Sequence, residues 1–525
     1  MLNNSSGILK GSKYKLFFFF LLSYPIFSQN FLGIIGSNYI GPNAIAVNPA
    51  NTVDTREKFS LNIASVGFDF QNNYARWTAP YSFLSFITQS VPSEYKNSNG
   101  TLILWRSEYI TPITQKKKVN MFANAELKGP AFHFDFKKIG LGIAAGVRYR
   151  FLTSISQNSP EVGLAIVEGT KSSNLIGKTF ENQKIVLNSG YYNEFFGSLA
   201  KVILKDEERF LKIGITGKYL VSDMAVNILA NNFAFNVITS PTDNKKQNIN
   251  LPYTEATYAL ASIHNGLNAT VFTDQMTKLS GIGKGFGGDL GLIYEFRPDV
   301  MSFSRNNNGK GFTDPTKNKY LFKIGFSIVD IGFIRFASDN FVRTNEIYSK
   351  NDQILPGDYN KINGYEELIS STEQVYNVTN PTFVRNFLIY TPASAVTTFD
   401  YNFKPNLYLN IIWRQYLLQS SKIGPVGYSG ISVIPRYEKK NYMISVPISL
   451  DNNYQNLNIG FSARYSSFFV GSDNLTGWLN LFNPRGLSVF AGAFIPLYHK
   501  LPESPLKCYD SGIYRKFKKK SRRKL

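Results

Sequence analysis

Two residues in the first third of the chain have the side chains of an acid–base pair. His133 and Asp135 lie in the run AFHFDF, residues 131–136, where apolar and polar side chains alternate. This alternation predicts a strand with both polar side chains on one face. Residues two apart on a strand are about 7 Å from each other, so the carboxylate orients the imidazole poorly. The sequence locates no nucleophile beside the pair, and we expect a protein that is not an enzyme.

A glycine-rich run, GKGFGG at residues 283–288, matches the GxGxxG pattern of dinucleotide-binding proteins. In those proteins the pattern opens a helix, whose N-terminus meets the phosphates. Here a strand-like segment follows from Asp289, so we expect a bulge or a wall without side chains instead. The chain has no HExxH or CxxC motif and no calcium-loop spacing of carboxylates. We therefore expect no metal and no other cofactor.

Basic residues recur on the polar side of strand-like segments. In residues 141–151, apolar side chains at odd positions alternate with glycine, alanine and arginine at even positions. Charged side chains are costly in lipid, so such a face must line the interior of a barrel. Two interpretations stay open: an interior filled by salt bridges, or a basic pathway for anions or lipid head groups. The basic residues that we expect on this lumen face are Arg148, Arg150, Lys212, Lys218 and Lys323.

Alternation of this kind extends over most of the chain and predicts an all-β fold, a transmembrane antiparallel β-barrel. The 525 residues include 43 Phe and 31 Tyr, as two aromatic girdles require. Beyond the N-terminal region, no stretch approaches the roughly 20 apolar residues of a membrane-spanning helix. A closed sheet is the other structure that satisfies the backbone in lipid. We expect about 14 strands within residues 59–498.

The N-terminus has the pattern of an export signal. Lys10, Lys13 and Lys15 precede the apolar run Leu16–Phe27, which is too short to span a bilayer as a helix. We therefore predict a signal peptide at residues 1–28. Together with the barrel it predicts an outer-membrane location.

An irregular segment, residues 29–58, follows the predicted signal peptide. Pro49 disfavours helix at Asn48 and removes a ladder donor, so this segment is not expected to be a strand. Lipid cannot satisfy its backbone, which places it in the lumen or at the rim. We expect a hatch or plug that contains the motif Asn48, Pro49 and Ala50.

Two later regions also depart from the barrel pattern. Residues 338–392 are polar and too long for a hairpin turn, so they predict an insertion in the barrel. Six strand-like segments follow this insertion, and counting back from the last one puts it on the periplasmic side. Residues 499–525 form a basic tail within a chain of net charge +21. After export such a tail meets no nucleic acid, and it is either solvated or docks to a periplasmic protein or cell-wall partner. Its basic residues are Arg515, Lys516, Lys518, Lys519, Lys520, Arg522, Arg523 and Lys524.

Short motifs in a fixed order carry a resemblance to a known group of barrels. The run VNPAN at residues 47–51 resembles the "NPA" segment of the long-chain fatty-acid (FadL-type) transporter superfamily. The runs SIVDIG at 327–332 and FVGSDN at 469–474 are similar to later elements of its relatives. Together they resemble an uncharacterised Bacteroidota outer-membrane barrel family of unknown function, close to PorP/SprF-like and PorV-like barrels.

This resemblance implies two functions for an outer-membrane barrel with an N-terminal hatch. The first is a structural or assembly component that recruits periplasmic or surface partners, in a role like type IX secretion or gliding. The alternative is a FadL-like transporter of hydrophobic or amphipathic molecules. The insertion and the basic tail favour the first, so we expect an assembly role. Outer-membrane lipid is the expected surroundings in both cases, and a hydrophobic ligand belongs to the second.

Overall fold

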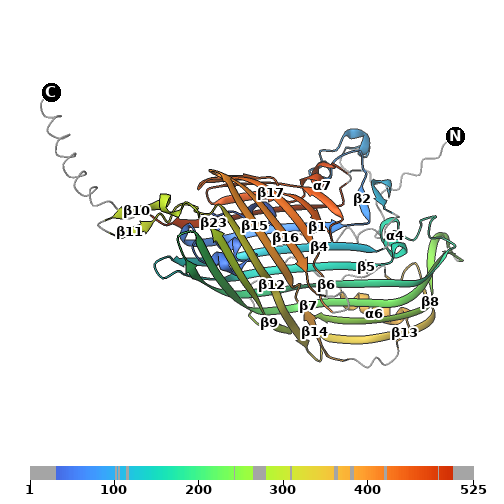
Figure 1. The fold of residues 1–525 in the computed structure, drawn as a ribbon. Helices are drawn as coiled ribbons and strands as arrows, with labels where there is room; N and C mark the ends of the chain where they lie inside the picture. Colours follow the sequence, from blue (N-terminus) through green and yellow to red (C-terminus); the bar gives the residue numbers. More distant parts are fainter. Residues whose placement is uncertain are drawn as a thin grey trace, which may run out of the picture.

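The strands of the computed structural model form one closed antiparallel barrel of 14 strand positions (Figure 1), which confirms the predicted fold class. The barrel closes where β1 (Glu57–Asn72) pairs with β23 (Gly486–Tyr498) on one side and with β4 (Val119–Phe136) on the other. We call the end where β1 begins and β23 ends the base, and the opposite end the rim. The structure describes residues 31–100, 103, 107–113, 118–241, 243–263, 279–307, 310–359, 365–378, 384–418, 423–482 and 484–500.

At several positions of the barrel, two shorter strands lie end to end and pair with successive parts of the same neighbouring strand. One of these positions consists of β8 and β9, which pair in turn with the rim and base halves of β7. Five such positions reduce the sheet of 19 strands to 14 positions. The remaining strands of this sheet are β5 (Leu141–Asn158), β6 (Thr179–Lys205), β7 (Arg209–Ser240), β8 (Asp243–Ser262), β9 (Gly283–Phe296), β12 (Phe322–Ala337), β13 (Val342–Ile354), β14 (Asn386–Tyr390), β15 (Ser394–Lys404), β16 (Leu407–Tyr416), β17 (Gly430–Glu438), β18 (Tyr442–Ser445), β19 (Ile448–Asp451), β20 (Asn456–Ile459), β21 (Phe461–Tyr465) and β22 (Phe468–Ser472).

The wall of the barrel has two different heights. On one side, which we call the long wall, β6 and β7 have 27 and 32 residues. On the other side, the short wall, β17 has 9 residues and β22 has 5. The long wall therefore extends well beyond the short wall toward the rim.

Short elements complete the described chain. The rim holds β2 (Ala75–Trp77), α3 (Phe83–Ile87), η3 (Ser93–Tyr95), η4 (Ser107–Tyr109), β3 (Ile110–Pro112), α4 (Pro160–Glu168), α6 (Tyr365–Val375) and α7 (Leu475–Leu479). The base holds η5 (Val300–Phe303), β10 (Ser304–Asn307) and β11 (Lys310–Thr313). No helix among the described residues is long and apolar enough to span a membrane.

Side chains alternate across the wall as the sequence predicts. In β4, Phe132 and Phe134 are 42% and 37% exposed, whereas His133 between them is 1% exposed. The outward face of the barrel is a belt of large apolar side chains, and its inward face is rich in Ser, Asn and charged residues. This arrangement suits lipid outside and polar groups inside. The glycine run at 283–288 lies within β9, as part of the wall.

Residues 338–392 are only partly an insertion, and the connection within them lies at the end of the barrel opposite to that given by the strand count. They contain β13, which continues the wall beyond β12, then α6 and β14. The connection that carries α6 lies at the rim, opposite the base where both ends of the barrel sheet lie. The strand count failed because residues 457–470 hold two barrel positions, β20/β21 and β22, joined by a tight turn. Ser466 takes a positive φ of 51° in this turn, and no glycine or proline marks it.

Apolar clusters fill both faces of the long wall near the rim. Inside, Leu220 and Ile334 pack with Phe336 and Phe387. On the opposite face, Tyr149 belongs to a larger cluster with residues of α4 and α6. The predicted signal peptide and the basic residues of the tail lie outside the described residues.

Candidate functional site: the segment that closes the lumen

Residues 31–56, which we call the lumen segment, cross the inside of the barrel near its base (Figure 1, dark blue). The segment consists of α2 (Leu32–Ile35), η1 (Gly41–Ala44) and η2 (Pro49–Thr52). Helix α2 contacts β17 and β21 of the short wall, whereas η2 contacts β6, β7 and β9 of the long wall. The segment therefore spans the lumen from one wall to the other, where the irregular sequence of residues 29–58 leads us to expect a hatch.

The first half of the segment is held by apolar packing. The ring of Phe31 lies 5.0 Å from that of Phe490 and 6.0 Å from that of Phe469, measured between centroids. Leu32 and Ile35 join a second cluster formed by valine and isoleucine side chains of β12, β15, β16 and β17. These contacts remove apolar surface of both the segment and the barrel wall from water, which stabilises the docked segment.

A single carboxylate anchors the beginning of this half. Asp473, which follows β22, accepts hydrogen bonds of 3.1 Å from the backbone N–H groups of Leu32 and Gly33. Ser445 donates from its hydroxyl to the carbonyl oxygen of Gly33. These two N–H groups lie in the first turn of α2, where the helix itself supplies no acceptor for them, so Asp473 fixes where α2 begins.

The Asn48-Pro49-Ala50 motif docks against glycines of the long wall. Asn48 caps η2 by accepting from the Ala50 N–H at 2.9 Å, and its amide donates to carbonyl oxygens of β9 and β12. A Cβ atom at Gly291 would lie 2.2 Å from Asn48 Oδ1, and one at Gly214 would lie 2.4 Å from the carbonyl carbon of Pro49. The wall thus has room for the motif only because these positions lack side chains.

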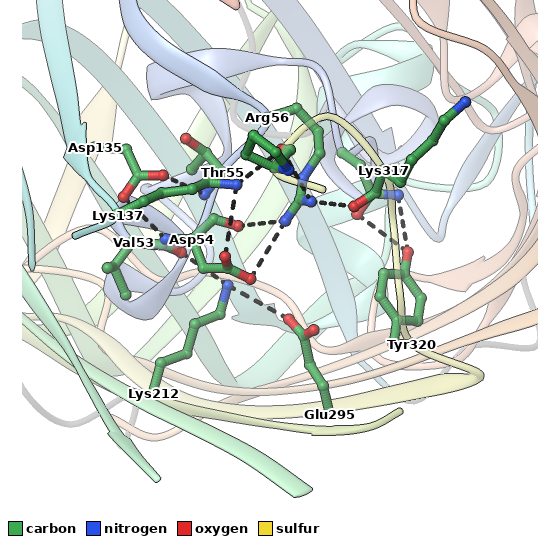
Figure 2. A network of polar contacts seen from close by, with 12 residues as sticks. Val53, Asp54, Thr55, Arg56, Asp135, Lys137, Lys212, Glu295, Lys317 and Tyr320 are labelled. Carbon is green, nitrogen blue, oxygen red and sulfur yellow. Dashed lines mark hydrogen bonds and ion pairs between the residues drawn. The ribbon is translucent and has the colours of Figure 1, made fainter. Parts of the chain in front are cut away.

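The end of the segment is held by ion pairs at the base (Figure 2). Asp54 lies 2.6 Å from a guanidinium nitrogen of Arg297 and 3.6 Å from the ammonium of Lys137. Burial alone raises the pKa of the Asp54 carboxyl, but Arg297 and Lys137 outweigh it and hold this pKa well below its usual range. Arg56 donates to the carbonyl oxygen of Lys317, so the loop between β11 and β12 closes over the segment from below.

His133 and Asp135 both serve to hold the lumen segment. His133 Nε2 lies 2.9 Å from the carbonyl oxygen of Thr52, and its Nδ1 lies 3.2 Å from Ser60 Oγ. Asp135 accepts hydrogen bonds from the backbone N–H groups of Asp54 and Thr55. The hydrogen bonds of both side chains thus give them a structural role in holding the lumen segment.

The five predicted basic residues all point into the lumen, and all form ion pairs. Lys212 lies 3.5 Å from Glu295 and also donates to the carbonyl oxygen of Val53 at 3.0 Å. Lys323 lies 3.7 Å from Asp400. Of the two interpretations, the geometry matches a lumen filled by salt bridges.

Asp330 is the centre of the largest ion-pair network among the residues that the structure describes. It lies 3.0 Å from Arg148, 3.0 Å from Arg150 and 2.8 Å from Lys218. Its φ of 60° falls at a register shift between β12 and β9, which places its carboxylate on the inward face. Further carboxylates surround the same cations, namely Glu126, Glu194 and Asp289.

The sequence did not point to the acidic partners or to several further contacts of the segment. Asn38 donates to Glu438 and to the hydroxyl of Tyr320, which in turn contacts Asp400. Alternation alone would have placed Glu126 and Glu194 on the inward face. Tyr320 lies outside the strands, and Asp473 follows one, so alternation carries no signal for either.

Comparisons with solved structures find two toluene transporters and an outer-membrane protease at low similarity. The Pseudomonas putida toluene transporter TodX is 10% identical, covers 90% of this chain and 98% of its own, and has a TM-score of 0.30. The Ralstonia pickettii toluene transporter TbuX is 9% identical, with 90% and 99% covered and a TM-score of 0.28. The Escherichia coli outer-membrane protease OmpT is 8% identical, with 84% and 97% covered and a TM-score of 0.20.

No curated protein matches the chain. The comparisons name neither PorP/SprF-like nor PorV-like barrels. A family model covers residues 49–473, which includes the Asn48 motif from Pro49 onward and most of the barrel. The chain belongs to this family, described as a family of unknown function (DUF5723), in line with the expected family of unknown function.

Proposed function

We propose that this protein is an outer-membrane transport barrel for small hydrophobic or amphipathic molecules. In this proposal the lumen segment is a hatch that moves to open the path. The observation that carries the proposal is how the segment is attached. Among the described residues, one backbone–backbone hydrogen bond joins residues 31–56 to the barrel, from His499 N–H to the carbonyl oxygen of Arg56. The other hydrogen bonds between segment and wall involve side chains.

This attachment allows the segment to move without breaking the sheet. A backbone ladder is cooperative, whereas each side-chain hydrogen bond contributes only about 0.5–1.5 kcal/mol when water can replace it. The closed barrel also forms its ladder between β1 and β23 without the segment. Displacement of the segment therefore leaves the wall intact.

The substrate class follows from the interior nearer the rim. There the inward face of the long wall is apolar, with Leu220, Ile334 and Phe336 each at most 1% exposed. These side chains pack against one another between the rim and the charged lumen segment, so a molecule on this path would have to displace part of an apolar cluster. An apolar barrier of this kind disfavours ions and favours hydrophobic or amphipathic molecules.

The assembly role that the sequence led us to expect now has less support. It depended on residues 338–392 and on the basic tail. The first region is partly barrel wall at the rim, and the basic residues of the tail lie outside the described residues. Nothing in the comparisons favours a type IX secretion role.

A reversible cross-link tests whether the hatch must move. Thr52 Oγ1 and Ser198 Oγ lie 3.2 Å apart, so cysteines at both positions bring two sulfur atoms within reach of a disulfide. In a Cys508→Ser background, the pair Thr52→Cys and Ser198→Cys would tie η2 to β6. We expect oxidised protein in lipid vesicles to lose uptake of toluene and of dodecanoate, and reduction to restore it.

A matched control separates the hatch from the wall. Thr153 Oγ1 and Ser189 Oγ lie 2.8 Å apart on the neighbouring strands β5 and β6. A disulfide there ties wall to wall and leaves the lumen segment free, so uptake should persist after oxidation. Equal uptake by the oxidised and reduced Thr52/Ser198 pair would contradict a moving hatch. Uptake no faster than in protein-free vesicles would contradict transport of these probes.

A further inference from the structure

Five large apolar side chains are exposed together above the short wall. We call them the rim patch: Leu84, Ile87, Leu479, Leu481 and Phe482, of which Phe482 is 77% exposed. Two come from α3 and three from α7 and the residues after it. The two helices contact each other, and the rings of Phe83 and Trp478 lie 6.0 Å apart. The patch is therefore one continuous surface built from two distant parts of the chain.

Hydrogen bonds cap the two helices beneath the patch and tie α7 to the barrel wall. Ser82 caps α3 by accepting from the Ser85 N–H at 3.0 Å, and Asn474 caps α7 by accepting from the Gly477 N–H at 3.1 Å. The indole N–H of Trp478 donates to the carbonyl oxygen of Ser488 in β23 at 2.6 Å. The patch is thus fastened directly to the barrel wall.

The height of the short wall places this patch at a membrane surface. A membrane-spanning strand needs about 9–11 residues, and the apolar band of a barrel is about 25 Å tall. The 9 residues of β17 are just enough to cross such a band, and α7 lies where β22 ends and before β23 begins. At β17 the short wall is therefore about as tall as such a band.

The rim patch also continues the belt of exposed apolar side chains on the outside of the barrel. Leu457 and Val489 lie in the rim halves of β20 and β23, and Val470 lies at the middle of β22; all three are exposed apolar side chains on the outside of the wall. Helix α7 contacts β20 and β23 directly above them. A surface that is continuous with lipid-facing residues at this height meets the same lipid.

We propose that the rim patch inserts into the outer leaflet at the boundary between head groups and acyl chains. It then fixes the depth and tilt of the barrel on the side of the short wall. The long wall on the other side stands clear of the membrane, where its exposed side chains meet water. The occupant of the patch is thus the lipid surface and not a second protein.

Spin labels on the full-length protein in phosphatidylcholine vesicles test this proposal. In the Cys508→Ser background, Phe482→Cys labels the rim patch and Leu290→Cys labels the belt on β9, where Leu290 is 53% exposed. Tyr348→Cys, at a 70% exposed position of β13, labels the long wall. We expect the label at 482 to collide with lipid-dissolved oxygen and to be protected from a water-soluble nickel chelate, like the label at 290. The label at 348 should show the opposite.

Two outcomes would overturn the proposal. A label at 482 as accessible to nickel as the label at 348 would mean that the patch meets water. Protection from both reagents, with a dependence on the ratio of protein to lipid, would mean that a second copy covers it. Heat-modifiable gel mobility shows that each variant is folded, and Leu481→Cys repeats the measurement at a neighbouring position.

Discussion

Residues 31–47 and residues 48–56 cross the same lumen. Both have polar contacts with the wall, including those of the first part with Asp473 and Glu438, but only the first part adds two clusters of buried apolar side chains. The first part packs Phe31, Ile34 and Leu32 against apolar side chains, mostly of the short wall. The second part is held by hydrogen bonds and by the ion pairs of Asp54. Truncation of an apolar side chain destabilises the protein because it leaves a cavity. The free energy of a polar contact depends instead on the charges of its groups and on whether water can replace the lost partner. The two halves should therefore respond to different changes, and opening should begin at the polar half.

The largest effect is expected from loss of an aromatic ring in the apolar half. Phe490→Ala removes a ring that is 1% exposed and lies 5.0 Å from that of Phe31. Large-to-small changes of this kind cost about 4 kcal/mol of unfolding free energy. Urea unfolding measures this change, and hydrogen exchange should quicken at residues 31–36 but not at residues 52–56. Phe468→Ala, at a 68% exposed position, is the control with a smaller cost.

The polar half should respond most to loss of its central carboxylate. Asp54→Asn removes the carboxylate beside Lys137 and one of the two carboxylates beside Arg297, which keeps Glu295 at 2.6 Å, in a buried site. Breaking one side of a buried pair costs about 3 kcal/mol. Hydrogen exchange should quicken at residues 52–56 first, and quickening that begins at residues 31–36 would contradict separate halves. Asp206→Asn removes an exposed pair with Arg209 and should change stability by less than about 1 kcal/mol.

A pair of glycines on one strand tests whether the Asn48 motif needs its close contact with the long wall. Gly214→Ala adds a Cβ atom 2.4 Å from the carbonyl carbon of Pro49, so the motif must shift. Overpacking of this kind costs about 2 kcal/mol. Gly217, three residues along β7, has no atom within 4 Å of the same added Cβ. Hydrogen exchange at residues 48–53 should therefore quicken in Gly214→Ala and stay unchanged in Gly217→Ala, and equal behaviour would refute tight docking.

The contrast between the halves also shows what the sequence could predict. Period-2 alternation is local, so it placed Arg148 and Lys218 on the inward face correctly. It could not pair them with Asp330, because that side chain is turned inward by a register shift at a positive φ. The turn at Ser466 is likewise unmarked by glycine or proline, and missing it reversed the predicted side of residues 338–392. The irregular N-terminal segment was expected in the lumen because lipid cannot satisfy its backbone.

The smallest effect is a dependence of the polar half on pH. Lys319, in the loop below the lumen segment, is buried near Asp54, Arg56, Lys137 and Arg297. Burial and the charge of Arg56 lower the pKa of Lys319 to about 7. A lysine released into water regains its usual pKa, so the open state holds a proton that the closed state has lost above pH 7. The closed state is therefore favoured as pH rises through 7.

This linkage amounts to about 1 kcal/mol between pH 6 and pH 8 for one group. Lys137, whose pKa burial lowers to about 8, acts in the same direction. Hydrogen exchange at residues 52–56, corrected with an unstructured peptide for the intrinsic effect of pH, should be slower at pH 8 than at pH 6. Lys319→Met removes the group with the lower of these two pKa values and should remove the larger part of this difference, whereas residues 31–36 should show little in either protein. The titrating lysines lie beside residues 48–56 and not beside residues 31–36. An equal pH response of hydrogen exchange in both halves would therefore mean that the two halves open together.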